Sequence, residues 1–97
     1  MFQRIVCFKF KDHCTDPEIA AHMRDFAELQ VRISQIASYH GGRVTDQAAP
    51  YDSLHYLTFR TVDDVDVYFH HDAHQAFIRS HRDQWADVLV LNGPIED

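Results

Sequence analysis

Residues 68–77 read Tyr68-Phe69-His70-His71-Asp72-Ala73-His74-Gln75-Ala76-Phe77, and this stretch brings three histidines and a tyrosine to a point where two helices should meet. A helix over about 62–69 is expected before it, capped by Thr61 and Asp64. A second helix begins at Asp72, which caps it with Gln75 at the third position. The second helix is predicted to carry Ala73, Phe77, His81 and Trp85. Neutral imidazole and phenol groups can share a proton near pH 7, so the segment points to acid–base chemistry.

Alternating side chains predict strands on both sides of this segment. Residues 2–11 form a strand whose apolar face also carries Arg4, and residues 51–60 form another. The pair Gly41-Gly42 predicts a bent strand with a bulge over 38–45. Residues 88–91 are apolar on both faces, which is typical of a buried strand, and Asn92-Gly93-Pro94 ends it. The residues expected to face the helices are Phe2, Val6, Phe8, Phe10, Ser53, His55, Leu57 and Phe59.

A long helix follows the first strand. Thr15 and Glu18 form a capping box, with Thr15 as the cap and Glu18 three residues later. Apolar residues then recur at intervals of three and four, which predicts one buried face. That stripe consists of Ile19, Met23, Phe26, Leu29, Ile33 and Ile36.

The resulting order, β-α-β-β-α-α-β, predicts an α+β fold of the ferredoxin-like type over a single domain, residues 1–97. This fold is a four-stranded antiparallel sheet with helices on one face. Ile5, Cys7, Leu54 and Tyr56 would face away from the helices and leave apolar surface exposed. Burial against a second copy, sheet to sheet, predicts a homodimer in which the two sheets form a barrel.

The amino-acid composition limits the kinds of partner that we expect. The chain has 97 residues, 45% of them apolar, which suits one small core. Its 15 acidic residues outnumber its 9 lysines and arginines, so nucleic acid is not an expected partner. No apolar run approaches the roughly 20 residues that cross a bilayer, and the first residues lack a secretion-signal pattern. We therefore expect a cytoplasmic protein without a membrane partner, in which Cys7 and Cys14 are free thiols.

The sequence resembles the stress-responsive A/B barrel (Dabb) family, a branch of the dimeric α+β barrel superfamily. The resemblance covers nearly the whole chain. It rests on residues 5–11, on Tyr51-Asp52 and Phe59 of the third strand, on residues 68–77 and on residues 88–91. Residues 68–77 follow the family pattern Tyr-x-x-His-Pro-x-His-x-x-Phe, with Asp72 in place of proline. Either residue starts a helix well.

The resemblance implies a homodimeric barrel and a functionally mixed family. Its members include plant stress proteins, bacterial proteins of unassigned role and a plant polyketide cyclase that closes an aromatic ring by an aldol step. In that cyclase the histidine that matches His74 is the general base, and the tyrosine that matches Tyr68 helps to hold the substrate. Arg4 stands where many members have a histidine, which replaces a switchable group by a permanent cation.

Four polar side chains are predicted to converge in an otherwise apolar cleft, as in many small-molecule sites. His74 lies in the first turn of its helix, where the macrodipole keeps the ring neutral, so we assign it as base. Arg4 is the predicted anion anchor, and Tyr68 and His55 are orienting donors or oxyanion stabilisers. Catalytic candidates are thus His74 and Tyr68, and substrate-binding candidates are Arg4, His55 and His71.

Each of these assignments has a structural alternative. In this alternative, His74 packs with one nitrogen bonded to backbone, and Tyr68 is a core aromatic with a satisfied hydroxyl. Arg4 would then extend to solvent from the strand end. No metal is expected, because the helix break at His71-Asp72 would separate His70 from His74. His13, His22 and His40 are predicted to be exposed.

Three functions fit these residues, and whether the protein is an enzyme stays open at this point. The first is a cofactor-independent cyclase or lyase that acts on a small enolisable acid, polyketide-like or aromatic. The second is a non-catalytic dimer that binds a hydrophobic ligand or serves in stress response. The third, from the wider superfamily, is a monooxygenase that uses haem or the substrate itself, but its site residues are not matched here. A chamber of roughly 300 Å³ or more between sheet and helices would favour a ligand.

Overall fold

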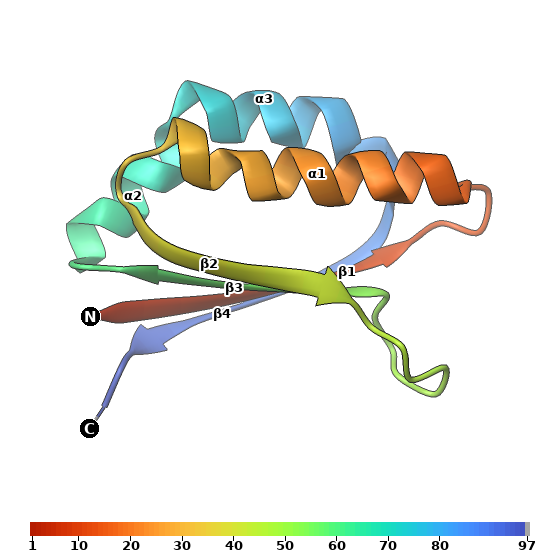
Figure 1. Cartoon of the computed structure of the whole chain (residues 1–97), viewed down its shortest axis with the longest axis horizontal. Coiled ribbons are helices and arrows are strands. Elements are labelled where there is room, and N and C mark those ends of the chain that lie inside the picture. The colour runs from red at the N-terminus through yellow and green to blue at the C-terminus, as the bar shows by residue number, and fades with distance from the viewer. Residues whose placement is uncertain (97) are drawn as a thin grey trace.

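A computed structural model describes residues 1–96 as one antiparallel sheet with helices on one of its faces (Figure 1). The strands are β1 (Phe2–Phe10), β2 (Ile36–Arg43), β3 (Ser53–Phe59) and β4 (Trp85–Pro94), in the spatial order β2-β3-β1-β4. The helices are α1 (Asp16–Arg32), α2 (Val62–His70) and α3 (Asp72–His81), and a 3₁₀ turn, η1 (Arg82–Gln84), leads into β4. The predicted ferredoxin-like α+β fold is confirmed.

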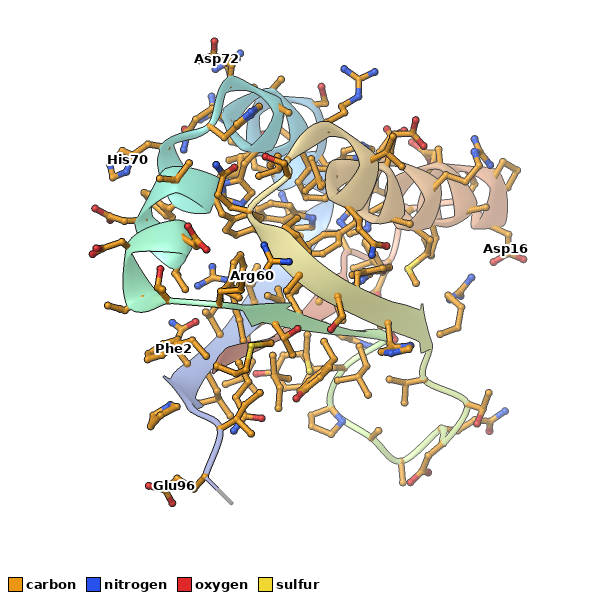
Figure 2. All side chains as sticks on the ribbon, turned by 60° about the vertical axis from the view of Figure 1, so that its left-hand side comes forward. Phe2, Asp16, Arg60, His70, Asp72 and Glu96 are labelled. Atoms are coloured by element: carbon orange, nitrogen blue, oxygen red, sulfur yellow. The ribbon has the colours of Figure 1, made fainter. Side chains whose placement is uncertain are left out.

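The core lies between the sheet and the helices, and side chains fill this layer (Figure 2). Alternation in β1 buries Val6, Phe8 and Phe10 there, as predicted. In β3 the same parity buries His55 and Leu57, which are 0% exposed. Pairing of Val6 with His55 and with Val90 aligns the three strands, so one face of the sheet is continuous across them.

The first helix begins with the predicted capping box: the Thr15 hydroxyl accepts from the Glu18 backbone N–H, and the Glu18 carboxylate accepts from the Thr15 N–H. Its end differs from the prediction. The helix stops at Arg32 with Ile33 in an extended C-cap conformation, and Ile36 already belongs to β2. Ile36 continues the apolar spacing of the helix because it is a buried residue of β2 that lies three positions after the buried Ile33.

The bulge in β2 lies elsewhere than predicted. The register with β3 shifts between Ile36 and Ser38, whereas pairing runs regularly through Gly41 and Gly42. Gly41 has a different role: a Cβ atom there would overlap the Tyr39 hydroxyl and approach Nδ1 of His55. The absence of a side chain at Gly41 thus makes room for a contact between those two residues.

The break between α2 and α3 falls at His71, whose backbone is extended. Its Nδ1 accepts from the Ala73 N–H at 3.0 Å, so His71 is the N-cap of α3. The prediction that Asp72 caps this helix was therefore wrong by one residue. His70 and Asp72 point outward on either side of the break (Figure 2).

The last strand is longer and less covered than expected. Trp85, predicted on the preceding helix, is its first residue, because η1 ends the helical segment at Gln84. The strand lies at an edge of the sheet and leaves Val90 40% and Leu91 55% exposed in the single chain, so it is not buried on both faces. None of the helices described in residues 1–96 has the length and apolar character of a membrane span.

The sheet face opposite the helices carries an apolar surface. Cross-strand pairs Ile5–Leu91, Cys7–Leu89 and Cys7–Leu54 lie on this face. Leu54 is 47% exposed. All the helices lie on the opposite face of the sheet (Figure 1). We call this surface, with Tyr56, the outer face. Cys7 and Cys14 are free thiols, as predicted.

Candidate functional site

A chamber of about 120 Å³ lies between β1 and β4 on one side and the helices α1, α2 and α3 on the other. Most of its wall is apolar and aromatic. Its polar side chains are Arg4, Tyr68 and His74, three of the five residues proposed from the sequence. The chamber is smaller than the roughly 300 Å³ expected of a ligand site. Its apolar lining consists of Val6, Phe8, Phe26, Phe69, Phe77, Ile78, Trp85, Val88 and Val90.

A second and wider hollow adjoins the chamber. Its volume is about 470 Å³, and it shares Arg4 and Phe69 with the chamber. We call it the vestibule; its other lining residues are Val62, Asp63, Val65, Asp66 and Asn92. Arg4 therefore lies at the boundary between the aromatic chamber and the more polar vestibule.

His74 lies in the first turn of α3 and is 6% exposed. Its Nδ1 donates to the Phe69 carbonyl at 3.0 Å, one of the α2 carbonyls that lack a partner within the helix. With Nδ1 holding the proton, Nε2 keeps its lone pair, and no hydrogen bond to Nε2 is formed within the described chain. Burial lowers the pKa of His74, and the Arg4 charge acts in the same direction, whereas the bond to Phe69 opposes both. The ring is therefore neutral at pH 7 and available as a base.

Tyr68 lies in the last turn of α2 with 0% exposure, and its ring is centred 4.4 Å from that of His74. Its hydroxyl has no hydrogen-bond partner among residues 1–96. This differs from the structural alternative of a core tyrosine with a satisfied hydroxyl. Burial raises the pKa of Tyr68 to about 12, although the adjacent Arg4 guanidinium favours the ionised phenol and opposes this rise, so Tyr68 is a donor and not an anion at neutral pH.

Arg4 is half-buried and held inside the site at two points. Its Nη1 donates to Asn92 Oδ1 at 3.0 Å across the β1–β4 ladder, and its Cζ lies 5.5 Å from the centre of the Tyr68 ring. Nε of Arg4 is buried without a partner in the described chain. No carboxylate of residues 1–96 lies within 4.0 Å of this guanidinium. The cation is thus oriented but not neutralised.

Asn92 was not recognised from the sequence, where it served only as a strand terminator. Its role depends on the register that pairs it with Arg4. Phe69 and Trp85 were also missed as chamber residues.

His55 and His71 do not line the chamber or the vestibule. The Tyr39 hydroxyl lies 2.8 Å from Nδ1 of His55, and Ser53 Oγ lies 3.2 Å from its Nε2. Its ring stacks on Phe26 at 4.1 Å, and burial lowers its pKa to about 4. The structure therefore places His55 in a satisfied core position, and His71 at the cap of α3.

His22 was predicted to be exposed, and this was wrong: it is 0% exposed. It precedes Phe26 by four residues and so shares the buried face of α1. Its Nε2 accepts from Trp85 at 3.0 Å, and its ring lies 5.0 Å from that of His81. His81 in turn bonds Asp25 at 2.7 Å. Within residues 1–96 there is no group of three or more His, Cys, Asp or Glu side chains placed to hold a metal ion.

The family model described as "Stress Responsive A/B Barrel Domain" matches residues 2–93. No curated protein matches the sequence. Among solved structures, a hydroxynitrile lyase from Passiflora edulis superposes with a TM-score of 0.89 at 20% identity, covering 99% of this chain and 94% of the other. The Arabidopsis thaliana protein At3g17210 gives 0.88 at 21% identity, covering 100% and 97%.

A third similar structure, a dimeric ferredoxin-like protein of unknown function from Thermobifida fusca, gives a TM-score of 0.86 at 20% identity. The match covers 97% of this chain and 90% of that one. At such identities the likeness shows the fold.

Proposed function

This chain belongs to the stress responsive A/B barrel family, and from that premise we propose that it is a homodimeric, cofactor-independent enzyme acting on a small enolisable acid. The substrate class is aromatic or polyketide-like. It binds in the chamber with its anionic group on Arg4, and His74 is the general base. A cytoplasmic location, expected from the sequence, is part of the same proposal.

The observation that supports this function is the set of unused polar atoms around one chamber. Arg4 Nε and Tyr68 Oη are two of the three buried side-chain polar atoms that lack a partner in residues 1–96. Each such atom costs about 1–3 kcal/mol of folding stability. Both line the chamber together with His74, whose Nε2 is free. A ligand that accepts hydrogen bonds would bind Arg4 Nε and Tyr68 Oη. Its acidic C–H group could then face Nε2 of His74.

The chemistry follows from the donors and acceptors present. His74 Nε2 takes a proton from the carbon next to a carbonyl, and the C–H electron pair moves into the carbonyl to give an enolate. Tyr68, protonated because its pKa is about 12, donates to the developing oxyanion. Arg4 supplies positive charge at the mouth of the chamber. In a cyclase, the enolate carbon then attacks a second carbonyl of the same molecule, and the imidazolium formed at His74 protonates the alkoxide that results. In a lyase, the enolate electron pair expels a leaving oxygen from the next carbon, and the imidazolium protonates that oxygen.

His55 and His71 have structural roles in this proposal. The first is occupied by Tyr39 and Ser53, and the second by the Ala73 N–H. The likeness to the Passiflora hydroxynitrile lyase supports acid–base lyase chemistry as one form of the reaction. The apolar outer face supports a dimer formed sheet to sheet.

Deuterium exchange into an enolisable acid tests the proposal. Phenylpyruvate in D₂O, followed by proton NMR at C3, should exchange faster with the wild-type protein than with buffer, and His74→Ala should remove the acceleration. His70→Ala is the matched control, because His70 is exposed and bonds only within α2. Equal acceleration by His74→Ala and the wild type would refute the role of His74 as base.

The second candidate is a non-catalytic dimer that binds a small hydrophobic ligand or serves in stress response. The observation in its favour is the predominantly aromatic wall of a chamber of only about 120 Å³. Binding of phenylpyruvate without any acceleration of exchange would favour this function over the enzyme.

A further inference from the structure

Phe69 and Arg4 are the two residues that line both the chamber and the vestibule. Phe69 lies in the last turn of α2 and is 45% exposed, although it is a large apolar side chain. Its ring is centred 5.7 Å from that of His74. The side chain therefore stands at the boundary of the two hollows, beside the proposed base.

The volumes limit what the chamber can hold. Cavities of roughly 150 Å³ bind benzene, so about 120 Å³ accommodates a group no larger than a single ring. Ligand sites usually begin at about 300 Å³. A larger ligand has to extend into the vestibule, and it must pass between Phe69 and Arg4 to do so.

The charges limit the ligand further. Arg4 has no carboxylate partner in the described chain, so it has capacity for one anionic group. The other charged residues of the vestibule, Asp63 and Asp66, are acidic. They disfavour further negative charge on a part of the ligand that extends outward.

Building on the function proposed above, we propose that Phe69 is the specificity-determining residue of this site. Its ring closes the chamber around a single-ring monocarboxylic acid, with the carboxylate on Arg4 at the boundary. Bicyclic acids are excluded because their second ring would occupy the position of the Phe69 side chain. The carbonyl that orients His74 belongs to the backbone of Phe69, so a substitution of the side chain leaves that hydrogen bond in place.

The test compares binding of phenylacetate and 1-naphthylacetate by isothermal titration calorimetry. The wild type should prefer phenylacetate, and Phe69→Ala should shift the ratio of the two Kd values toward 1-naphthylacetate by about tenfold or more, the usual effect of removing a steric limit in an apolar pocket. Phe69→Leu should give an intermediate ratio. Val67→Ala is the matched control, since Val67 is 44% exposed on the same helix and lines neither hollow.

Two negative results of the binding experiment would have different consequences. Binding of both acids with the same ratio in the wild type and Phe69→Ala would overturn the role of Phe69 and leave the proposed function standing. Binding of neither acid to either protein would overturn the proposed function, and this inference with it. Circular dichroism of each variant establishes that the fold is retained.

Discussion

Trp85 donates its indole N–H to Nε2 of His22 at 3.0 Å and so links the start of β4 to the buried face of α1. Because Nε2 accepts, the imidazole is neutral with its proton on Nδ1, and that nitrogen has no partner within residues 1–96. Burial lowers the pKa of His22 to about 3, and the nearby His81 and His55 add to the effect. Protonation of His22 is thus incompatible with the native contacts of this ring.

The burial of His22 and His55 in neutral form predicts that the protein loses stability in acid. The pKa values of His22 and His55 are about 3 and about 4 in the folded protein, below the ordinary value of about 6.5 in the unfolded chain. The unfolded state therefore binds protons first as the pH falls. The free energy of unfolding should be fully present above pH ~6.5 and should decrease below it, by up to about 2 kcal/mol per histidine at pH ~5.

Urea unfolding between pH 7.5 and pH 5, at one protein concentration, measures this decrease. His22→Gln keeps an acceptor for Trp85 but does not titrate, so its curve should be flatter than that of the wild type. His13→Gln, at an exposed position, should follow the wild type. Identical slopes for His22→Gln and the wild type would contradict the assignment.

Gly41→Ala should destabilise the protein by about 1–3 kcal/mol. The added methyl group would overlap the Tyr39 hydroxyl, displace the Tyr39 ring and break its 2.8 Å hydrogen bond to His55. Gly42→Ala is the neighbouring control, since a Cβ atom there has no neighbour within 4 Å in the described chain. Thermal unfolding of both variants measures the difference, and equal Tm values would show that Tyr39 adapts without loss.

Tyr68→Phe should leave stability unchanged or raise it by up to about 1 kcal/mol, because it removes a buried hydroxyl without a partner. The same change should slow proton exchange in the substrate, since the oxyanion donor is lost. Tyr39→Phe provides the contrast: it removes a hydroxyl that bonds His55 and should cost about 1–3 kcal/mol. A marked loss of stability in Tyr68→Phe would mean that the hydroxyl is satisfied in solution.

Leu54→Asp should convert the proposed sheet-to-sheet homodimer to a monomer in sedimentation velocity. Leu54 lies on the outer face with 47% exposure, and a carboxylate there would be buried unpaired in a sheet-to-sheet interface. Val31→Asp, at a position of α1 that is 79% exposed, should not change the molecular mass. A dimer that persists in Leu54→Asp would place the interface on another surface.

The fold was largely predictable because its signals are local. Alternation in residues 2–10 and the Thr15–Glu18 capping box depend on neighbours within a few positions, and both are present as expected. The errors lie at element boundaries. Ile36 and Trp85 were assigned to helices because apolar spacing continues across a turn, and a turn leaves no mark on periodicity.

The site was predictable only in part. Tyr68 and His74 lie in a recognisable junction motif, and Arg4 follows from strand parity, so the sequence indicated all three polar residues of the chamber. Strand parity places His55 on the same face of the sheet as Arg4, but the Tyr39 hydroxyl of the neighbouring strand β2 is hydrogen-bonded to Nδ1 of His55. That contact depends on the pairing of Gly41 with His55, which parity alone does not determine.

By itself, the sequence determined the order of helices and strands, the face that each strand buries and the identity of the candidate base, since these depend on residues close together in the chain. The tertiary structure decided which polar groups meet. It set Asn92 beside Arg4 and Trp85 beside His22, and it left Tyr68 without a partner. The physical reason is that strand register and helix packing join residues 63 and 88 positions apart, and no local pattern encodes those separations.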